Sequence, residues 1–417
     1  MEYGCIGKKL SHSFSKIIHN ELMDYTYELK ELSENELDVF LTEKNFKAIN
    51  VTIPYKQAVI PYLEEIDPVA EEIGAVNTIV NRNGKLSGYN TDFSGMSALI
   101  NKNGILFDNK KVLILGSGGT SKTAYAVAQA LNAKEIYRVS RAGKDGCITY
   151  QAAYSLHPDT EIIINTTPCG MYPYIGETAI DISRFENLSG VVDAVYNPLK
   201  SALIVEAEKR GIKACGGLYM LVFQAAAAAE HFIGEKINVS EIDRVYNKLL
   251  KDKQNLVLIG MPGCGKSTIG KKLATLLNKE FIDTDSLIVE KAGCPITEIF
   301  KQQGEKKFRD IESLVIKETA ALQGKIIATG GGAVLRKENV DILKENGIIV
   351  FIDRPIEFLV TTDDRPLSNN REKLERLFEE RYSIYCNSAD ITIKAVQQIE
   401  QNIEAIKEEF LRENTCY

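Results

Sequence analysis

The segment GMPGCGKST, residues 260–268, constrains the fold of this chain more than any other part of the sequence. It follows the apolar run NLVLI (255–259) and precedes the helix-forming stretch TIGKKLATLL. The pattern GxxxxGK[ST] is met by Gly260, Gly265, Lys266 and Ser267. In this strand–loop–helix context, backbone N–H groups cradle phosphates, the lysine reaches the outer phosphates and the hydroxyl can ligate Mg²⁺. The segment therefore predicts a nucleoside triphosphate site in an α/β domain.

A second glycine-rich turn stands earlier in the chain, in VLILGSGGTSKTA (112–124). Gly116 permits a tight turn after the strand, Gly118 lets the backbone approach a pyrophosphate, and the helix that follows supplies free N–H donors. Ser121 replaces the third glycine of the strict dinucleotide pattern. The turn predicts a dinucleotide site, and a purely structural turn is the alternative.

The residues after the next predicted strand bear on which dinucleotide is bound. About 20 residues beyond the glycine turn, an acidic residue would bind the ribose of NAD. The sequence has Ser140, Arg141 and Lys144 there instead. A cation suits a 2′-phosphate and favours NADP, whereas the alternative is a solvated arginine on a loop.

The length of 417 residues predicts two or three domains. From residue 111, the short apolar strands in KVLILG, EIYRVS, EIIINTTP and GVVDAVYNP are separated by helical stretches, which predicts a parallel βαβ sheet. Upstream, FKAINVTIP (46–54) predicts a strand, and residues 75–92 predict two strands around the Asn83-Gly84 turn. Residues 217–250 predict helices, and the charged run KLLKDKQN (248–255) marks a boundary before a second α/β series.

The composition of the chain and its apolar runs argue against several classes of binding partner and location. The net charge of −7, with both signs interspersed, argues against a nucleic-acid or anionic-membrane partner. Eight cysteines without a CxxC pair argue against zinc, and residues 1–20 lack the apolar core of a signal peptide. The most apolar run, 218–229, is too short to span a bilayer. We expect a soluble, cytoplasmic protein that acts on small molecules, with the oligomeric state left open.

Six blocks in the first part of the chain together resemble shikimate dehydrogenase over about residues 1–250. They are SHSFSKIIHN (11–20), NVTIPYK (50–56), GAVNT (74–78), YNTD (89–92), NTTPCGM (165–171) and GGLYMLVFQAA (216–226). The resemblance implies that 3-dehydroshikimate is bound by Ser13, Ser15, Thr52, Asn77, Tyr196 and Gln224. It implies NADP(H) contacts from Gly116, Ser117, Gly118, Gly119, Thr120, Ser140, Arg141 and Met220. Two departures from the family pattern are Lys16, where proline is usual, and Ser140, where asparagine is usual.

Lys56 and Asp92 look like the catalytic pair of that family. Hydride delivery to a ketone builds negative charge on its oxygen, which a positioned ammonium group can stabilise or protonate. The carboxylate of Asp92 would orient that ammonium. Without the family context, the alternatives are a solvated surface lysine and a helix N-cap before FSGMSALI.

Five further blocks, with the phosphate loop, resemble shikimate kinase over about residues 255–417: FIDTDSLI (281–288), FRDIE (308–312), ATGGGAV (328–334), DRPL (364–367) and ERYSIY (380–385). The resemblance implies shikimate contacts from Asp285, Arg309, Gly331, Gly332 and Arg381. It implies ATP contacts from Gly263, Cys264, Gly265, Lys266, Ser267, Thr268 and Arg365, and Mg²⁺ contacts from Ser267 and, through water, Asp283. Asp285, Lys266 and Arg365 would be catalytic.

Alternatives remain open in this half too. Asp283 and Asp285 could merely cap the next helix, and Arg309 with Glu312 could be a surface pair. The lid region TTDDRPLSNN carries Arg365 as its only cation together with two acids.

The resemblances imply an α/β chain with two enzymes. Residues 1–250 would comprise a substrate-binding part (1–105 and 217–250) and a Rossmann NADP-binding part (106–216), and residues 255–417 a P-loop kinase with a parallel sheet. The expected function is NADPH-dependent reduction of 3-dehydroshikimate to shikimate and ATP-dependent phosphorylation of shikimate. The alternatives are a quinate/shikimate dehydrogenase using NAD in the first half, or one half acting as a non-catalytic binding or regulatory module.

Overall fold

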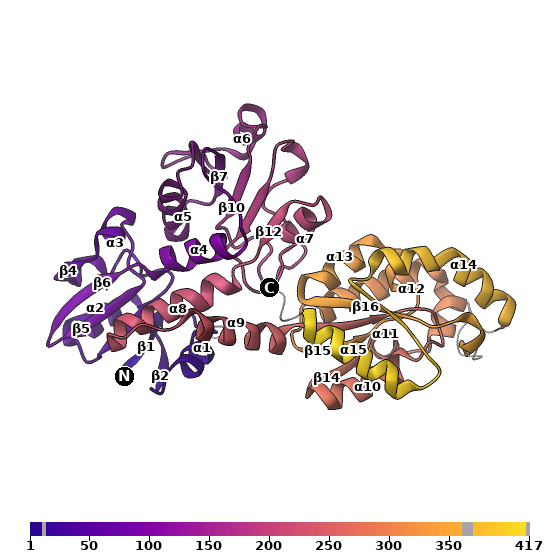
Figure 1. Ribbon diagram of the computed structural model, residues 1–417. Coiled ribbons are helices and arrows are strands. Elements are labelled where there is room, and N and C mark those ends of the chain that lie inside the picture. The colour runs from indigo at the N-terminus through magenta and orange to yellow at the C-terminus, as the bar shows by residue number, and fades with distance from the viewer. Residues whose placement is uncertain (11–13, 361–369, 414–417) are drawn as a thin grey trace. The chain divides into compact units, whose positions relative to one another are not determined.

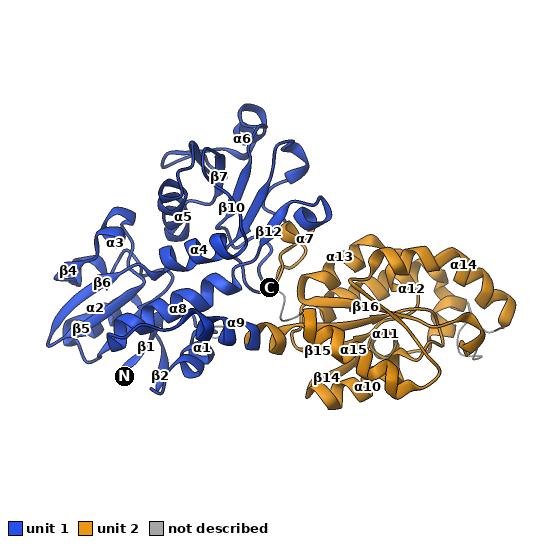
Figure 2. Ribbon diagram, viewed as in Figure 1, with its two compact units in different colours: residues 1–171, 177–197, 206–248 blue, residues 172–176, 198–205, 249–417 orange. Residues whose placement is uncertain are grey.

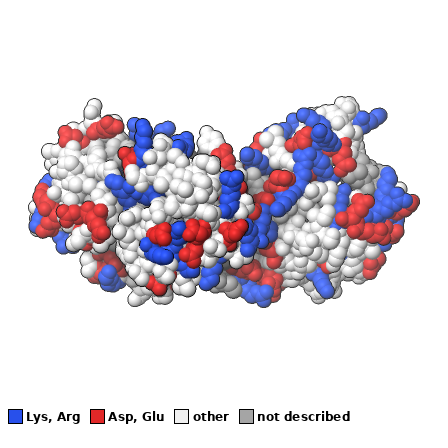
Figure 3. Space-filling model, turned by 90° about the horizontal axis from the view of Figure 1, so that it is seen from above, with Lys and Arg blue, Asp and Glu red and all other residues white. Residues whose placement is uncertain are grey.

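The computed structural model describes residues 1–10, 14–360 and 370–413 (Figure 1). The chain divides into two compact units (Figure 2). Unit 1 comprises Met1–Met171, Glu177–Asn197 and Glu206–Lys248, and unit 2 comprises Tyr172–Gly176, Pro198–Val205 and Leu249–Tyr417. Positive and negative side chains are mixed over the face seen in Figure 3.

Unit 1 contains a mixed sheet with the strand order β2-β1-β3-β5-β6-β4. Its strands are β1 (Tyr3–Gly7), β2 (Tyr27–Glu31), β3 (Ala48–Val51), β4 (Glu65–Ile66), β5 (Thr78–Arg82) and β6 (Lys85–Tyr89). β5 and β6 are antiparallel and form the predicted hairpin. Asn83 and Gly84 join them with φ values of 56° and 86°, the positive φ that a two-residue turn of this hand needs.

The helices of this part carry several of the candidate residues. They are α1 (Ser15–Leu22), α2 (Glu34–Glu43), α3 (Pro68–Ile73), α4 (Thr91–Lys102), α8 (Leu218–Ile233) and α9 (Val239–Lys253). α4 and α8 lie side by side (Figure 1). A Cβ on Gly95 of α4 would lie 2.6 Å from the carbonyl oxygen of Met220, so this glycine is what permits the close approach.

The second sheet of unit 1 is parallel, as predicted. Its strand order, β12-β11-β10-β7-β8-β9, is the doubly wound order of dinucleotide-binding domains. The strands are β7 (Lys111–Leu115), β8 (Glu135–Val139), β9 (Cys147–Ile148), β10 (Ile162–Asn165), β11 (Gly190–Asp193) and β12 (Lys213–Cys215), with helices α5 (Gly119–Ala130) and α6 (Tyr150–Leu156). Helix α7 (Ala202–Lys209) lies between β11 and β12 in sequence, and its first four residues are assigned to unit 2. The glycine turn after β7 lies where the strand order reverses, which is where ligands bind in such sheets.

Unit 2 is built on a parallel sheet with the order β14-β15-β13-β16-β17. The strands are β13 (Asn255–Ile259), β14 (Glu280–Asp283), β15 (Lys325–Ala328), β16 (Gly347–Asp353) and β17 (Ile391–Lys394). The helices are α10 (Lys266–Leu277), α11 (Thr284–Ala292), α12 (Ile296–Ala320), α13 (Lys337–Asn346), α14 (Arg371–Ser388) and α15 (Ile399–Glu413). Every residue of the central strand β13 is buried, which explains its continuous apolar sequence.

The run predicted to mark the boundary, residues 248–255, is mostly helical. Residues 248–253 continue α9, and Gln254 alone separates that helix from β13. The run contains neither Gly nor Pro, and its Lys and Leu residues favour helix, so nothing in it stops α9 at residue 250. Among the residues described, no helix is long and apolar enough to cross a membrane.

Candidate active sites

The first candidate site is centred on Lys56 and Asp92. Lys56 Nζ lies 2.5 Å from Asp92 Oδ2, and the two side chains are only 17% and 10% exposed. Asp92 stands in the first turn of α4, but the cap of that helix is Asn90, whose side chain accepts a hydrogen bond from the N–H of Phe93. The interpretations of a solvated lysine and of an N-cap aspartate are therefore wrong.

Asn77 holds the other oxygen of the Asp92 carboxylate. Its Nδ2 donates to Asp92 Oδ1 at 2.9 Å, and its Oδ1 accepts from the N–H of Thr91 at 2.7 Å. Gln224 on α8 completes the group, because its Oε1 lies 3.5 Å from Thr91 Oγ1. Segments far apart in sequence thus bring four of the predicted residues into one polar group, in which Asn77 and Asp92 are buried and Lys56 and Gln224 are half-buried.

Two residues of this group escaped the sequence analysis. Asn50 is buried in β3 and donates to Thr78 Oγ1 at 3.1 Å, while its own Oδ1 accepts from the hydroxyl of Tyr27 at 2.7 Å. Thr91 bonds Asn77 as described above. The available signal was a polar residue inside the apolar strand AINV, since a buried amide needs hydrogen-bond partners.

Of the four remaining residues predicted to bind substrate in unit 1, the structure describes three. Ser15 begins α1, Thr52 follows β3, and the half-buried ring of Tyr196 packs against Phe14 with 5.4 Å between centroids. Ser13 lies outside the described residues. Lys16 is exposed in the first turn of α1, a turn that also accepts proline, so the departure at this position leaves the helix intact.

The dinucleotide loop lies close to Lys56, one of the two residues predicted to be catalytic. Gly116 has a φ of +120°, and a Cβ there would lie 2.5 Å from Thr166 Oγ1, so the turn requires glycine. Ser121 Oγ donates to the carbonyl of Gly116 at 2.7 Å and braces the turn where the strict pattern has glycine. A Cβ on Gly119 would lie 4.0 Å from Cδ of Lys56, which places the lysine at the rim of this loop.

The other predicted NADP contacts divide into two groups. Ser117, Gly118, Gly119 and Thr120 form the exposed or half-buried turn that leads into α5, and Met220 is buried on α8. Ser140 follows β8 and accepts a hydrogen bond from the N–H of Gly143 at 3.1 Å. The side chains of Arg141 and Lys144 are exposed on the same loop, as a contact with a 2′-phosphate would require.

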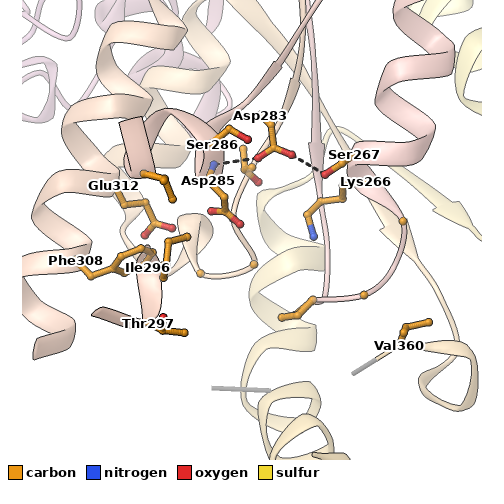
Figure 4. A pocket seen from close by; sticks show the side chains of 18 of the residues that line it. Lys266, Ser267, Asp283, Asp285, Ser286, Ile296, Thr297, Phe308, Glu312 and Val360 are labelled. Carbon is orange, nitrogen blue, oxygen red and sulfur yellow. Dashed lines mark hydrogen bonds between the residues drawn. The ribbon is translucent and has the colours of Figure 1, made fainter. Parts of the chain in front are cut away.

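The second candidate site is a cavity of about 880 Å³ in unit 2 (Figure 4). It is lined by the phosphate loop, by residues that follow β14 and β15, and by Arg309 and Arg381. This volume falls within the range of small-molecule sites. The cavity thus joins a loop that cradles phosphates to a set of groups able to bind a small acidic polyol.

The phosphate loop presents its charged and hydroxyl groups together. Lys266 Nζ donates to the carbonyls of Gly260 and Met261 at 2.8 and 3.1 Å. Ser267 Oγ donates to Asp283 Oδ2 at 2.6 Å, and the other oxygen of Asp283 accepts from the N–H of Asp285 (Figure 4). Asp283 therefore caps α11, as the alternative held, and also stands beside the hydroxyl predicted to ligate metal.

The oxygens of Ser267 and Asp283 suit Mg²⁺, which takes few protein ligands and completes its shell with water and phosphate. The donor set therefore fits a magnesium ion bound together with a nucleotide.

Arg309 is held between two carboxylates. Its Nη1 donates to Glu312 Oε2 at 2.8 Å and its Nη2 to Glu305 Oε1 at 3.0 Å. The side chains of Arg309 and Glu312 are 9% and 1% exposed, so the interpretation of a surface pair is wrong. Burial raises the pKa of Glu312. Its carboxylate points into the pocket with that of Asp285 (Figure 4), which makes Glu312 a site residue whose burial the sequence could not reveal.

The three glycines after β15 leave room for these side chains. A Cβ on Gly330 would lie 2.6 Å from Asp285 Oδ1, one on Gly331 2.9 Å from Pro262, and one on Gly332 2.0 Å from Arg309 Nη1. Arg381 Nη1 donates to the carbonyl of Gly331 at 3.1 Å. Arg309, Arg381 and Asp285 thus converge on this glycine segment, while Arg365 lies outside the described residues.

We expect Gly332→Ala to lower kcat/KM for the acidic substrate by roughly 10- to 100-fold, because the added methyl group displaces Arg309 from its position. Steady-state kinetics of Gly332→Ala, Arg309→Ala and the double variant test this. If the methyl group acts through Arg309, the double variant loses little more than Arg309→Ala alone. Additive losses would contradict the explanation.

Two family models match separate segments of the chain. The family model described as "Shikimate dehydrogenase substrate binding domain" matches residues 5–79, and the one described as "Shikimate kinase" matches residues 262–412. A curated "Shikimate dehydrogenase (NADP(+))" of Clostridium beijerinckii is 39% identical over 245 residues, which are 55% of this chain and 90% of that protein. A curated "Shikimate kinase" of the same species is 47% identical over 163 residues, which are 38% of this chain and 96% of that protein.

A solved structure also resembles the first part of the chain. The crystal structure of shikimate dehydrogenase 1 from Peptoclostridium difficile is 35% identical, with a TM-score of 0.55. The match covers 60% of this chain and 98% of that one.

Proposed function

This chain belongs to the shikimate dehydrogenase family through its N-terminal part and to the shikimate kinase family through its C-terminal part, and we propose that the two parts act in sequence. The first reduces 3-dehydroshikimate to shikimate with NADPH, and the second phosphorylates the resulting 3-hydroxyl with MgATP. The observation that carries the proposal is that each part brings its own predicted reactive groups together. These are Lys56 with Asp92 beside the dinucleotide loop, and Asp285 with Arg309 in the cavity of the phosphate loop.

In the reductase site, NADPH supplies the hydride that is delivered to the carbonyl carbon. Lys56 donates a proton to the carbonyl oxygen as negative charge develops there, and Asp92 orients the ammonium group and returns a proton to it from solvent. Asn77 keeps the Asp92 carboxylate in place through its 2.9 Å hydrogen bond. We assign the binding of the substrate polyol and carboxylate to Ser13, Ser15, Thr52, Asn77, Tyr196 and Gln224.

In the kinase site, the substrate hydroxyl attacks the terminal phosphorus of ATP, and the bond from that phosphorus to the bridging oxygen breaks to release ADP. Asp285 accepts the hydroxyl proton, and Arg309 and Arg381 bind the substrate carboxylate, for which a guanidinium fork is suited. Lys266 neutralises charge on the phosphates, and Mg²⁺ would be held by Ser267 directly and by Asp283 through water. The proposal includes the bounds of the two functional domains, 1–250 and 255–417. It also includes a cytoplasmic location, because the substrates and nucleotides of both reactions are available in the cytoplasm.

The test uses the full chain with 3-dehydroshikimate, NADPH and MgATP, with products identified by mass spectrometry. We expect shikimate 3-phosphate with all components, shikimate when ATP is omitted, and unchanged substrate when NADPH is omitted. Failure of either step in the folded protein would leave one part as a non-catalytic module. Turnover with NADP against NAD, and with shikimate against quinate, decides whether the first part is instead a quinate-type dehydrogenase.

A further inference from the structure

The segment that follows β16 lies against the phosphate loop of unit 2. A Cβ on Gly263 would lie 2.2 Å from the carbonyl oxygen of Val360, and one on Gly265 would lie 3.6 Å from Arg354 Nη1. Gly263 and Gly265 both have positive φ, at +80° and +100°. The loop glycines therefore allow the backbone to turn around phosphate, and Gly263 in addition leaves room for the backbone of Val360.

Arg354 is the charged residue of this segment that reaches the loop. It directly follows the last residue of β16, lines the nucleotide cavity, and its Nη1 lies 3.5 Å from the carbonyl oxygen of Cys264. Its Nε is buried without a hydrogen-bond partner. In the part of the chain that the structure describes, no carboxylate lies within 4.0 Å of this guanidinium.

The sheet order places Arg354 opposite the metal-binding side of the loop. β15 and β14, which lead to Asp283 and Asp285, lie on one side of the central strand β13, and β16 lies on the other. A nucleotide bound at the loop after β13 would therefore have the magnesium oxygens on one flank and Arg354 on the other. The predicted lid segment has a single cation and two acids, so it offers little positive charge to the phosphates. A positive charge on the β16 flank would compensate phosphate charge that the lid leaves over.

We propose that Arg354 is a nucleotide-binding residue that contacts the phosphate chain of ATP and ADP from the β16 side of the phosphate loop. The proposal rests on the kinase function proposed above. Among the described residues, the guanidinium of Arg354 has no carboxylate within 4.0 Å and its Nε has no hydrogen-bond partner. It therefore gains charge-assisted hydrogen bonds when phosphate arrives.

The test is MgADP binding to the full chain, measured by calorimetry for the wild type, Arg354→Ala, Arg354→Lys and Arg376→Ala. Arg376 is an exposed arginine of the same unit, paired with Glu372, so its replacement controls for the loss of one positive charge. We expect Arg354→Ala to raise the Kd for MgADP about 10- to 100-fold, with partial recovery in Arg354→Lys and no change in Arg376→Ala. A Kd for Arg354→Ala within about twofold of the wild type would overturn the proposal.

Two further measurements separate the possible failures. Magnesium tripolyphosphate, used as a competitor of MgADP, must also bind more weakly to Arg354→Ala. If magnesium tripolyphosphate binds Arg354→Ala as tightly as it binds the wild type, Arg354 contacts the base or sugar, and the proposed phosphate contact is overturned. Shikimate binding and thermal unfolding of Arg354→Ala must match the wild type. A wild-type chain without shikimate phosphorylation would overturn the proposed function instead, because the binding assay does not depend on turnover.

Discussion

Replacing Lys56 by alanine is expected to reduce the rate of 3-dehydroshikimate reduction by about 10²- to 10⁴-fold. The ammonium group of Lys56 lies 2.5 Å from Asp92 in a site where both side chains are largely buried. Without it, the alkoxide that forms on hydride transfer loses both its counter-charge and its proton donor. NADPH oxidation in the presence of 3-dehydroshikimate measures the loss.

The control for this variant is another lysine of unit 1. Lys85 pairs with Glu65 at the surface, where it is 54% exposed, and Lys85→Ala is expected to reduce substrate at the wild-type rate. Shikimate phosphorylation should persist in both variants, because Lys56 belongs to unit 1 and the phosphate loop to unit 2. Near-normal reduction by folded Lys56→Ala would remove the lysine from the mechanism.

Local sequence patterns were sufficient to predict the parallel sheet β7–β12 and the hairpin β5–β6 of unit 1, whereas the parallel sheet of unit 2 was expected from the resemblance to shikimate kinase. The phosphate loop could be predicted because its glycines, lysine and serine all lie within one short segment, residues 260–267. The hairpin could be predicted because its turn needs positive φ at both residues, which Asn83 and Gly84 accept. Both are short-range effects, in which the chain within a few residues determines the conformation. The end of α9 at Lys253 was missed because a charged run without Gly or Pro fits a helix as well as a boundary.

Burial could not be predicted in the same way, because it depends on segments distant in sequence. Arg309 and Glu312 have the spacing of an exposed helical pair, yet α12 places them against the glycines after β15. Arg354 likewise has the composition of a surface residue, and only the approach of its segment to Gly265 brings it to the loop. Asn50 is the intermediate case, since a polar residue in an apolar strand already indicates a buried network.

Replacing Lys266 by alanine is expected to reduce shikimate phosphorylation by about 10²- to 10³-fold or more, while 3-dehydroshikimate reduction continues. Its ammonium group lies at the loop carbonyls of Gly260 and Met261, within reach of the phosphates that the loop N–H groups cradle. Phosphoryl transfer depends on positioning and on charge neutralisation rather than on covalent chemistry by the protein, so loss of this fixed charge affects the transition state directly.

The matched control is Lys272→Ala, on the same helix α10. Lys272 pairs with Glu400 and is 48% exposed, so its replacement removes an equal charge without reaching the loop. Shikimate phosphorylation, followed by ADP release, should be normal in Lys272→Ala and nearly absent in Lys266→Ala. NADPH oxidation in the same preparations reports on the first site and on the folding of unit 1, and thermal unfolding reports on the folding of unit 2. Loss of both activities in a folded Lys266→Ala protein would contradict the view that the two sites work independently, because the phosphate loop would then support the reductase as well.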